Sequence, residues 1–309
     1  MDALRKGCDR ISELPDSLLT HILSYLSTKD SVQTSVLSKR WEFLWLNVSG
    51  LDLNAVDSLP YGEPLLRFMY RFLEFNRGSC LQTFKMKYCR HTKLGYDSKN
   101  SLEWITQVVH RRVQHLDLES RMYPRRLDIM PECVYVSKTL VSLKLVRIGL
   151  KNPKFDVSLP CLKIMHLANI FFKRSDDEGL SIMDYLCGDG HLIMKKLISG
   201  SPVLENFTME VSIGLATGFT GYPLVNSFWT NVPQCLSSTL EYVTISLTII
   251  ENETGIKLVN YFLENSAVLK KLTLTCKYYN KLKREMAESY YTKLLTSTRL
   301  STRCQVLVS

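Results

Sequence analysis

The sequence predicts an α/β protein in which a short helical segment precedes a long series of repeated strand units. Two observations lead to this prediction. Residues 9 to about 50 form a compact apolar segment that is interrupted by helix-capping residues. Beyond Trp45, the spacing apolar-x-x-apolar-x-apolar recurs eight times. The last two apolar residues of each unit alternate, as they do in a strand with one buried face.

The N-terminal segment is expected to form three short helices. Pro15 suits the first turn of a helix, because its missing N–H costs nothing there. Thr28 and Ser38 are suitable N-caps for the second and third helices, and Trp41 and Trp45 form an i, i+4 pair in the third. The first helix carries an apolar stripe at helical spacing, made of Leu18, Leu19, Ile22, Leu23 and Leu26.

This segment is too small to bury its own apolar surface, since domains below roughly 40 residues need outside help. It must dock on the rest of the chain or on a partner, and the pattern alone favours neither. The segment resembles a plant F-box almost without a gap. The matching residues are Leu14-Pro15-Asp16, Leu18-Leu19, Ile22-Leu23, Leu26, Thr28-Lys29, Thr34-Ser35-Val36-Leu37-Ser38-Lys39-Arg40-Trp41 and Leu44-Trp45.

The resemblance implies a role as an adaptor. An F-box docks on a Skp-type adaptor, which links it to a cullin and a RING partner in an SCF-type ubiquitin ligase. Ser38 and Arg40 are expected to fix the turn and its polar rim. Some of the apolar residues must be internal to the helical unit, and the sequence does not separate them from contacts. The expected partner-binding residues are Leu14, Pro15, Leu18, Ile22, Leu23, Leu26, Val36, Leu37, Ser38, Arg40, Trp41 and Trp45.

The repeated units predict an irregular leucine-rich-repeat solenoid, in which each strand and its return bury their core by stacking on neighbours. An ordinary α/β sheet with similar strands is the alternative, and the regular spacing favours the solenoid. Helical patterns are expected around residues 65–73, 102–109, 258–263 and 281–295. Segments such as Val113–Leu118, Leu140–Leu145 and Ile198–Glu205 resemble the repeats of plant F-box proteins, which implies that the repeats hold a protein substrate.

The repeat pattern fails between Val211 and Asn231, a stretch that is rich in glycine. Proteins of this type usually carry more repeats here, so the chain is expected to be shortened after residue 210, and the sequence leaves open whether the solenoid closes. The following block resembles an FBD module, whose last strand is expected to hide a sheet edge. The predicted domains are an F-box (8–50), irregular repeats (51–230) and an FBD-like C-terminal cap (231–309).

Composition favours a soluble protein of the cytoplasm or nucleus. No apolar stretch is long enough to cross a membrane, and the first residues lack the apolar core of a secretory signal. The nine cysteines form no Cys-x-x-Cys pair and are expected to be reduced.

Two basic segments account for more than the whole net charge of +9, and they leave nucleic-acid binding as an alternative function. Residues 81–126 hold ten basic and four acidic side chains, and residues 270–309 hold nine and two. Aromatic residues interleave with the second segment at Tyr278, Tyr279, Tyr290 and Tyr291. A solvated basic surface is the favoured interpretation. A shortened F-box protein without a complete substrate face is a further alternative.

The sequence contains no motif that indicates catalysis. It lacks a P-loop, Gly-x-Gly-x-x-Gly, Gly-x-Ser-x-Gly and His-Glu-x-x-His. We therefore expect a non-catalytic protein with no cofactor and no metal site. The identity of the substrate cannot be derived from the sequence.

Overall fold

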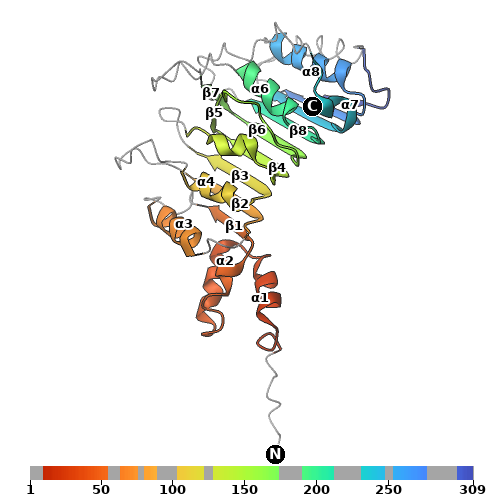
Figure 1. Cartoon of the computed structure of the whole chain (residues 1–309). Helices are drawn as coiled ribbons and strands as arrows, with labels where there is room; N and C mark the ends of the chain where they lie inside the picture. Colours follow the sequence, from red (N-terminus) through yellow and green to blue (C-terminus); the bar gives the residue numbers. More distant parts are fainter. Residues whose placement is uncertain are drawn as a thin grey trace, which may run out of the picture.

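The computed structural model describes residues 10–54, 63–75, 80–88, 103–121, 128–173, 190–211, 231–247, 253–276 and 298–308. Its main feature is a parallel sheet whose strands follow the order of the chain, from the N-terminal segment at one end to the C-terminus at the other (Figure 1). The nine described strands of this sheet are β1 (Gly50–Asn54), β2 (Thr83–Tyr88), β3 (His115–Ser120), β4 (Ser142–Val146), β6 (Ile164–Ala168), β8 (Asn206–Val211), β9 (Tyr242–Leu247), β10 (Lys271–Cys276) and β11 (Gln305–Val308).

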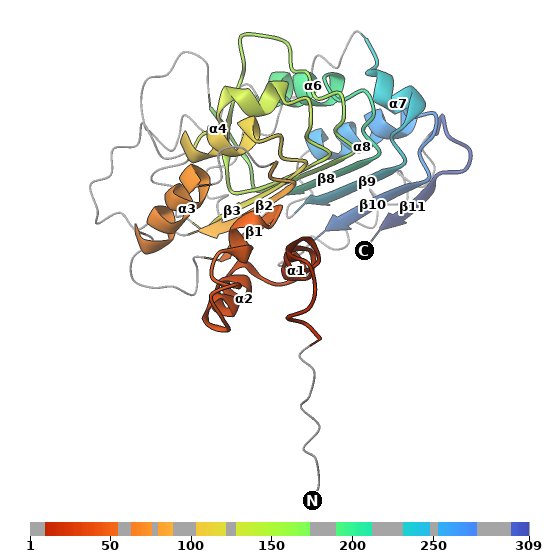
Figure 2. The ribbon, with the colours of Figure 1, turned by 60° about the horizontal axis from the view of Figure 1, so that its bottom comes forward.

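Helices cover one face of this sheet, and the other face is left open (Figure 2). We call the uncovered side the open face. A second, two-stranded sheet pairs β5 (Gly149–Lys151) with β7 (Phe171–Lys173). The helices beyond β1 are α3 (Glu63–Phe75), α4 (Glu103–His110), η4 (Glu132–Val136), α6 (Gly190–Ser199), α7 (Gln234–Ser238) and α8 (Glu253–Asn265).

The eight apolar triplets predicted from the sequence coincide with the first eight strands of the main sheet. The first member of each triplet precedes its strand and is buried in every unit, as Leu81 and Leu140 are. The other two members point into the core from alternate strand positions, as Phe84 and Met86 do in β2. Neighbouring strands pair with these positions in register, so they form two continuous buried rows across the sheet. The α/β class is therefore confirmed.

The predicted helices at 65–73, 102–109 and 258–263 correspond to α3, α4 and α8. The predicted helix at 281–295 lies outside the described residues. Across the stretch where the triplet pattern fails, β8 pairs directly with β9, and Asn206 lies opposite Tyr242. The sheet is therefore continuous between the strands on either side of that stretch.

The N-terminal segment contains two α-helices, α1 (Asp16–Leu23) and α2 (Thr28–Gln33), and then the 3-10 turns η1 (Thr34–Val36) and η2 (Leu44–Asn47). The third predicted helix does not form as an α-helix. Ser38 lies in a turn, and its backbone carbonyl accepts a hydrogen bond from the Trp41 N–H at 3.0 Å. Ser27, one residue before the predicted cap, caps α2 by accepting the Asp30 N–H. The three-helix prediction is thus replaced by two helices and a tight 3-10 segment.

Candidate protein-interaction surfaces

The N-terminal segment has a small core of its own. Leu19 and Leu23 from α1 pack with three residues of the 3-10 region, Trp41, Leu44 and Val48, and all five are buried. Leu14 is half-buried against them. Leu23 and Trp41, which the sequence placed among the partner contacts, are therefore internal to the segment. Their buried side chains hold α1 against the 3-10 region.

The opposite side of this segment is apolar and exposed. Leu18, Ile22 and Leu26 follow one another at helical spacing, and 48%, 44% and 42% of their side chains are exposed. Val36 and Leu37, on the neighbouring turn, are exposed by 85% and 65%. Such a gathering of large apolar side chains on a surface is typical of an interaction site. We call the following set the exposed F-box surface: Leu18, Ile22, Tyr25, Leu26, Val36 and Leu37.

Tyr25 belongs to this surface but was not among the residues expected from the sequence. It is 78% exposed, and its ring packs edge-on against His21 with 5.2 Å between ring centroids. Tyr25 comes seven residues after Leu18 and so lies on the same helical stripe, and this spacing is a sequence signal that could have identified it. Ile11 and Phe43, both 57% exposed, are further apolar residues of the segment that the prediction missed. They carry no comparable spacing signal.

Arg40 joins the two ends of the segment. Its guanidinium donates hydrogen bonds to the Asp16 carboxylate at 2.9 and 2.7 Å and to the carbonyl oxygens of Ser12 and Leu14. These bonds fix the turn before Trp41 against the start of α1, where Pro15 is the exposed N-cap. Arg40 therefore holds this turn against the start of α1.

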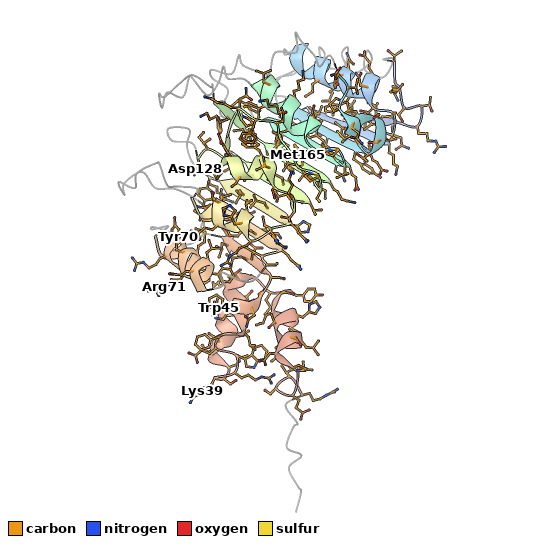
Figure 3. The ribbon with its side chains drawn as sticks, viewed as in Figure 1. Lys39, Trp45, Tyr70, Arg71, Asp128 and Met165 are labelled. Carbon is orange, nitrogen blue, oxygen red and sulfur yellow. The ribbon has the colours of Figure 1, made fainter. Side chains whose placement is uncertain are left out.

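Trp45 lies at the junction between the N-terminal segment and the sheet (Figure 3). Its ring stacks on Phe68 and Phe72 of α3, with 5.5 and 6.1 Å between ring centroids. Its indole N–H donates to the Glu42 carbonyl at 3.1 Å. The sequence placed Trp45 among the partner contacts, but its half-buried ring packs against residues of this chain. Its role in the structure is to attach the N-terminal segment to the first repeat unit.

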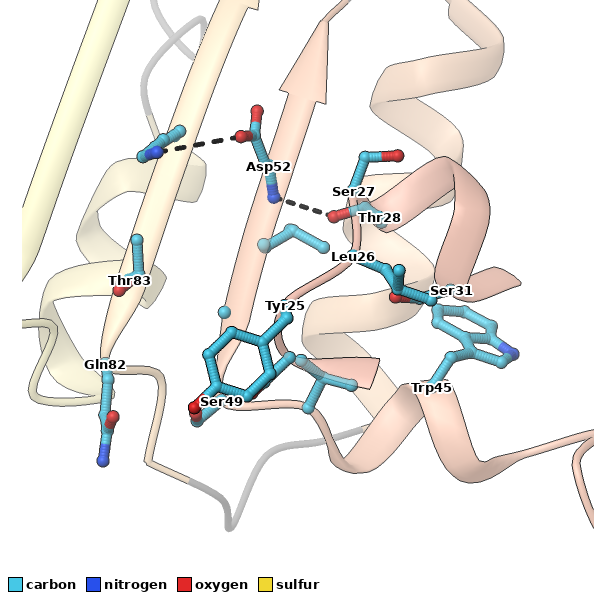
Figure 4. A pocket seen from close by; sticks show the side chains of 15 residues that line it. Tyr25, Leu26, Ser27, Thr28, Ser31, Trp45, Ser49, Asp52, Gln82 and Thr83 are labelled. Carbon is cyan, nitrogen blue, oxygen red and sulfur yellow. Dashed lines mark hydrogen bonds and ion pairs between the residues drawn. The ribbon is translucent and has the colours of Figure 1, made fainter. Parts of the chain in front are cut away.

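A hydrogen bond from β1 strengthens this junction. The N–H of Asp52 donates to the Thr28 hydroxyl at 2.7 Å, so a helix residue takes the place of a missing neighbour strand. Figure 4 shows this bond beside a groove of about 460 Å³ between α2 and the strands β1 and β2. The carboxylate of Asp52 lies 3.9 Å from the Lys85 ammonium across the same groove. The N-terminal segment therefore covers the first edge of the sheet.

The open face of the sheet changes character along its length. From β1 to β6, charged side chains pair across neighbouring strands, as Lys144 does with Asp117 at 3.3 Å and His166 with Glu210 at 3.1 Å. The Glu119 carboxylate forms ion pairs with the Lys87 ammonium at 3.3 Å and with the Arg147 guanidinium at 3.0 Å. From β8 to β10 the corresponding positions carry hydroxyl groups, except for Glu210 of β8; the hydroxyl residues are Thr208, Thr244, Thr273, Ser246 and Thr275.

Two ionisable groups of the open face have shifted pKa values. Burial raises the pKa of Glu119, but the hydrogen bond and charge of Lys87 and the charges of Arg147 and Arg121 outweigh it, so the net shift is downward. Burial lowers the pKa of His166, although the adjacent Glu210 opposes this effect. The charged part of the face is thus largely compensated from within.

Several cations of the two basic segments are paired or buried in the described part of the chain. In the first segment, Lys85, Lys87 and Arg121 each lie near a carboxylate, and Arg111 is buried with its guanidinium over the Phe72 ring. In the second, Lys270 pairs with Glu241 at 2.8 Å. The four tyrosines that suggested base stacking lie outside the described residues.

The described residues contain no group of three His, Cys, Asp or Glu side chains that could hold a metal ion. Within the same residues, no helix has both the length and the apolar character that crossing a membrane requires.

Comparisons with known proteins agree with the two modules seen in the sequence. The F-box domain family matches residues 11–51, and the FBD family matches residues 229–274. A putative FBD-associated F-box protein of Arabidopsis thaliana is 39% identical over 392 residues, which cover 97% of this chain and 99% of that protein.

Two further relatives come from the same plant. A putative F-box/FBD/LRR-repeat protein of Arabidopsis thaliana is 34% identical over 441 residues, covering 98% of this chain and all of that protein. Another F-box/FBD/LRR-repeat protein of Arabidopsis thaliana is 50% identical over 206 residues, which cover 66% of this chain and 42% of that protein. The chain therefore belongs to the plant F-box/FBD/LRR-repeat protein family.

Proposed function

We propose that this protein is a non-catalytic, substrate-recognition adaptor of an SCF-type ubiquitin ligase. The exposed F-box surface binds a Skp-type adaptor, and through it a cullin–RING ligase. The parallel sheet with its helices acts as an irregular leucine-rich-repeat solenoid that presents a protein substrate for ubiquitination. The proposed place of action is the cytoplasm or nucleus. The observation that carries the proposal is the apolar stripe of Leu18, Ile22, Tyr25 and Leu26, which is exposed although the segment has already closed its own core.

The exposed F-box surface suits helix-in-groove docking. Apolar anchors on a short helix enter a partner groove at helical spacing. Burying one Leu or Ile side chain completely contributes about 1.5–3 kcal/mol, and Leu18, Ile22 and Leu26 are each already about half-buried. Together with Leu37 these side chains supply several kcal/mol, which is enough for a specific interface whose binding energy lies in a few residues.

The junction supports the second half of the proposal. A substrate adaptor has to hold its substrate at a defined position relative to the ligase, so the F-box and the repeats should move as one body. Trp45 is stacked on α3, and the Thr28 hydroxyl binds the first strand at 2.7 Å. The first contact attaches the F-box to the first helix that covers the sheet, and the second attaches it to the sheet itself.

The test is a pull-down of the full-length chain and its variants on an immobilised Skp-type adaptor. Leu18→Asp and Ile22→Asp change the exposed F-box surface without entering its core. Leu192→Asp is the matched control, because Leu192 is also a partly exposed leucine on a helix, 38% exposed on α6, far from the F-box in the sequence. Circular dichroism and thermal unfolding check that each variant is folded.

We expect Leu18→Asp and Ile22→Asp to lose adaptor binding while they keep the unfolding temperature of the unchanged protein. Leu192→Asp should bind like the unchanged protein. If the unchanged chain binds no Skp-type adaptor, or if both charged F-box variants bind as well as the control, the proposal is wrong.

A further inference from the structure

The two ends of the parallel sheet are finished in different ways. At the first end, α2 lies against β1, and the Thr28 hydroxyl accepts the Asp52 N–H, which no strand of the described residues receives. At the other end lies β11, the outermost strand in Figure 2, which pairs with β10 and with no other strand of the described chain. The expected last strand does cover the edge of β10, but it forms a new edge itself.

The outer side of β11 carries backbone groups that point away from the sheet. The N–H of Gln305 donates to the Lys270 carbonyl at 2.9 Å, so this group faces β10. Since successive N–H groups of a strand alternate in direction, those of Val306 and Val308 face outward. An edge of this kind is a template for one more strand.

The side chains of β11 do not protect this edge. Natural edge strands are guarded by short length, charged side chains, proline or bulges, and β11 has only the short length. The residues between Gln305 and Val308 are uncharged and mostly β-branched or aliphatic. Leu307 is 45% exposed on the open face, next to Thr273 of β10. The strand is short, so a partner needs a further contact beyond main-chain pairing.

Positive charge at the start of β11 offers that contact. Arg303 is exposed two residues before the strand, and within the described residues it makes no ion pair. Lys271 lies opposite Gln305 in the register of the pair β10–β11. A carboxylate on an incoming strand can therefore approach two cations near the beginning of the edge, while the rest of the strand meets uncharged residues.

We propose that β11 accepts an extended segment of a protein partner, which joins the sheet as an additional strand. The segment is uncharged along the edge and carries an acidic group beside Arg303. A second copy of this chain is a poorer occupant, because residues 303–308 of its own edge contain no carboxylate that could meet Arg303. The inference does not depend on adaptor docking, which involves the other end of the sheet.

Fluorescence anisotropy with the full-length chain tests the proposal. The probe is a labelled peptide of alternating threonine and valine with one terminal glutamate, and a second peptide has lysine in place of glutamate. Val306→Pro removes an outward N–H without breaking the bond to β10, and Val306→Thr is the matched control that keeps the N–H. N-methylation of alternate peptide residues tests main-chain pairing without changing the protein.

We expect saturable binding of the glutamate peptide, a loss of about tenfold or more in affinity for Val306→Pro, and little change for Val306→Thr. Arg303→Glu should reverse the preference between the glutamate and lysine peptides. Methylation should abolish binding in only one of the two alternate patterns. Absence of binding, equal binding by Val306→Pro, insensitivity to methylation, or dimerisation of the chain that Val306→Pro abolishes would each overturn the proposal.

Discussion

Replacing Trp45 with alanine should destabilise the protein without removing a partner contact. The indole ring stacks on Phe68 and Phe72, with centroids 5.5 and 6.1 Å away, and its N–H donates to the Glu42 carbonyl. Truncating a buried Trp to alanine costs about 3–5 kcal/mol. Since Trp45 is only half-buried, we expect a loss of about 2–3 kcal/mol in the free energy of unfolding.

Urea unfolding of Trp45→Ala measures this loss, and the Skp-type adaptor pull-down is carried out on the folded protein. Trp45→Phe is the control, because it keeps a ring for stacking and loses only the hydrogen bond, for a cost of about 0.5–1.5 kcal/mol. Adaptor binding per folded molecule should stay unchanged in both variants. Unchanged stability combined with lost adaptor binding would show that Trp45 faces the partner and would refute this assignment.

Two smaller perturbations test other contacts. Thr28→Val leaves the Asp52 N–H without its acceptor at nearly constant volume, so urea unfolding should show a loss of about 1–3 kcal/mol; Thr28→Ser should restore most of it. The folded-state pKa of Glu119 lies below its ordinary value of 4.5, so its contribution to stability is present above that pH and disappears as the pH falls through the folded-state pKa. Glu119→Gln should therefore destabilise the protein at neutral pH, and this effect should shrink in unfolding curves measured near pH 3; an equal effect at both pH values would contradict the role of its charge.

The sheet was predictable because its signal is repeated and local. Each triplet fixes one anchor and two inward strand positions, and all eight triplets lie where strands form. The third F-box helix was not predictable in the same way. The pair Trp41 and Trp45 has helical spacing, but in the structure Trp41 is buried inside the F-box core, whereas Trp45 packs both against that core and against α3. Tertiary packing therefore decides the backbone there, and local spacing does not.

The candidate site was predictable as a set but not residue by residue. Leu18 and Leu19 are neighbours on one helix, yet one is 48% exposed and the other is fully buried. Both belong to the same broad apolar stripe, and only the position of the 3-10 segment determines which side is closed. Leu23 and Trp41 were assigned to the partner for the same reason. The sequence shows that the apolar stripe of the first helix is too wide to pack against the F-box core alone. It does not show which of its residues belong to that core and which stay exposed.

The pairing of β8 with β9 keeps the main sheet continuous across the stretch where the repeat pattern fails. The relatives align over 392 and 441 positions, so they carry residues that this chain of 309 residues lacks. Each pair of neighbouring strands in the main sheet joins first residue to first residue, as Asn206 joins Tyr242 and His115 joins Ser142. Because every strand offers its neighbour the same pattern, whole units can differ in number without disturbing the buried rows. A shift of one residue would instead turn a buried row outward. Differences from the relatives should therefore lie in the extent and the side chains of the open face.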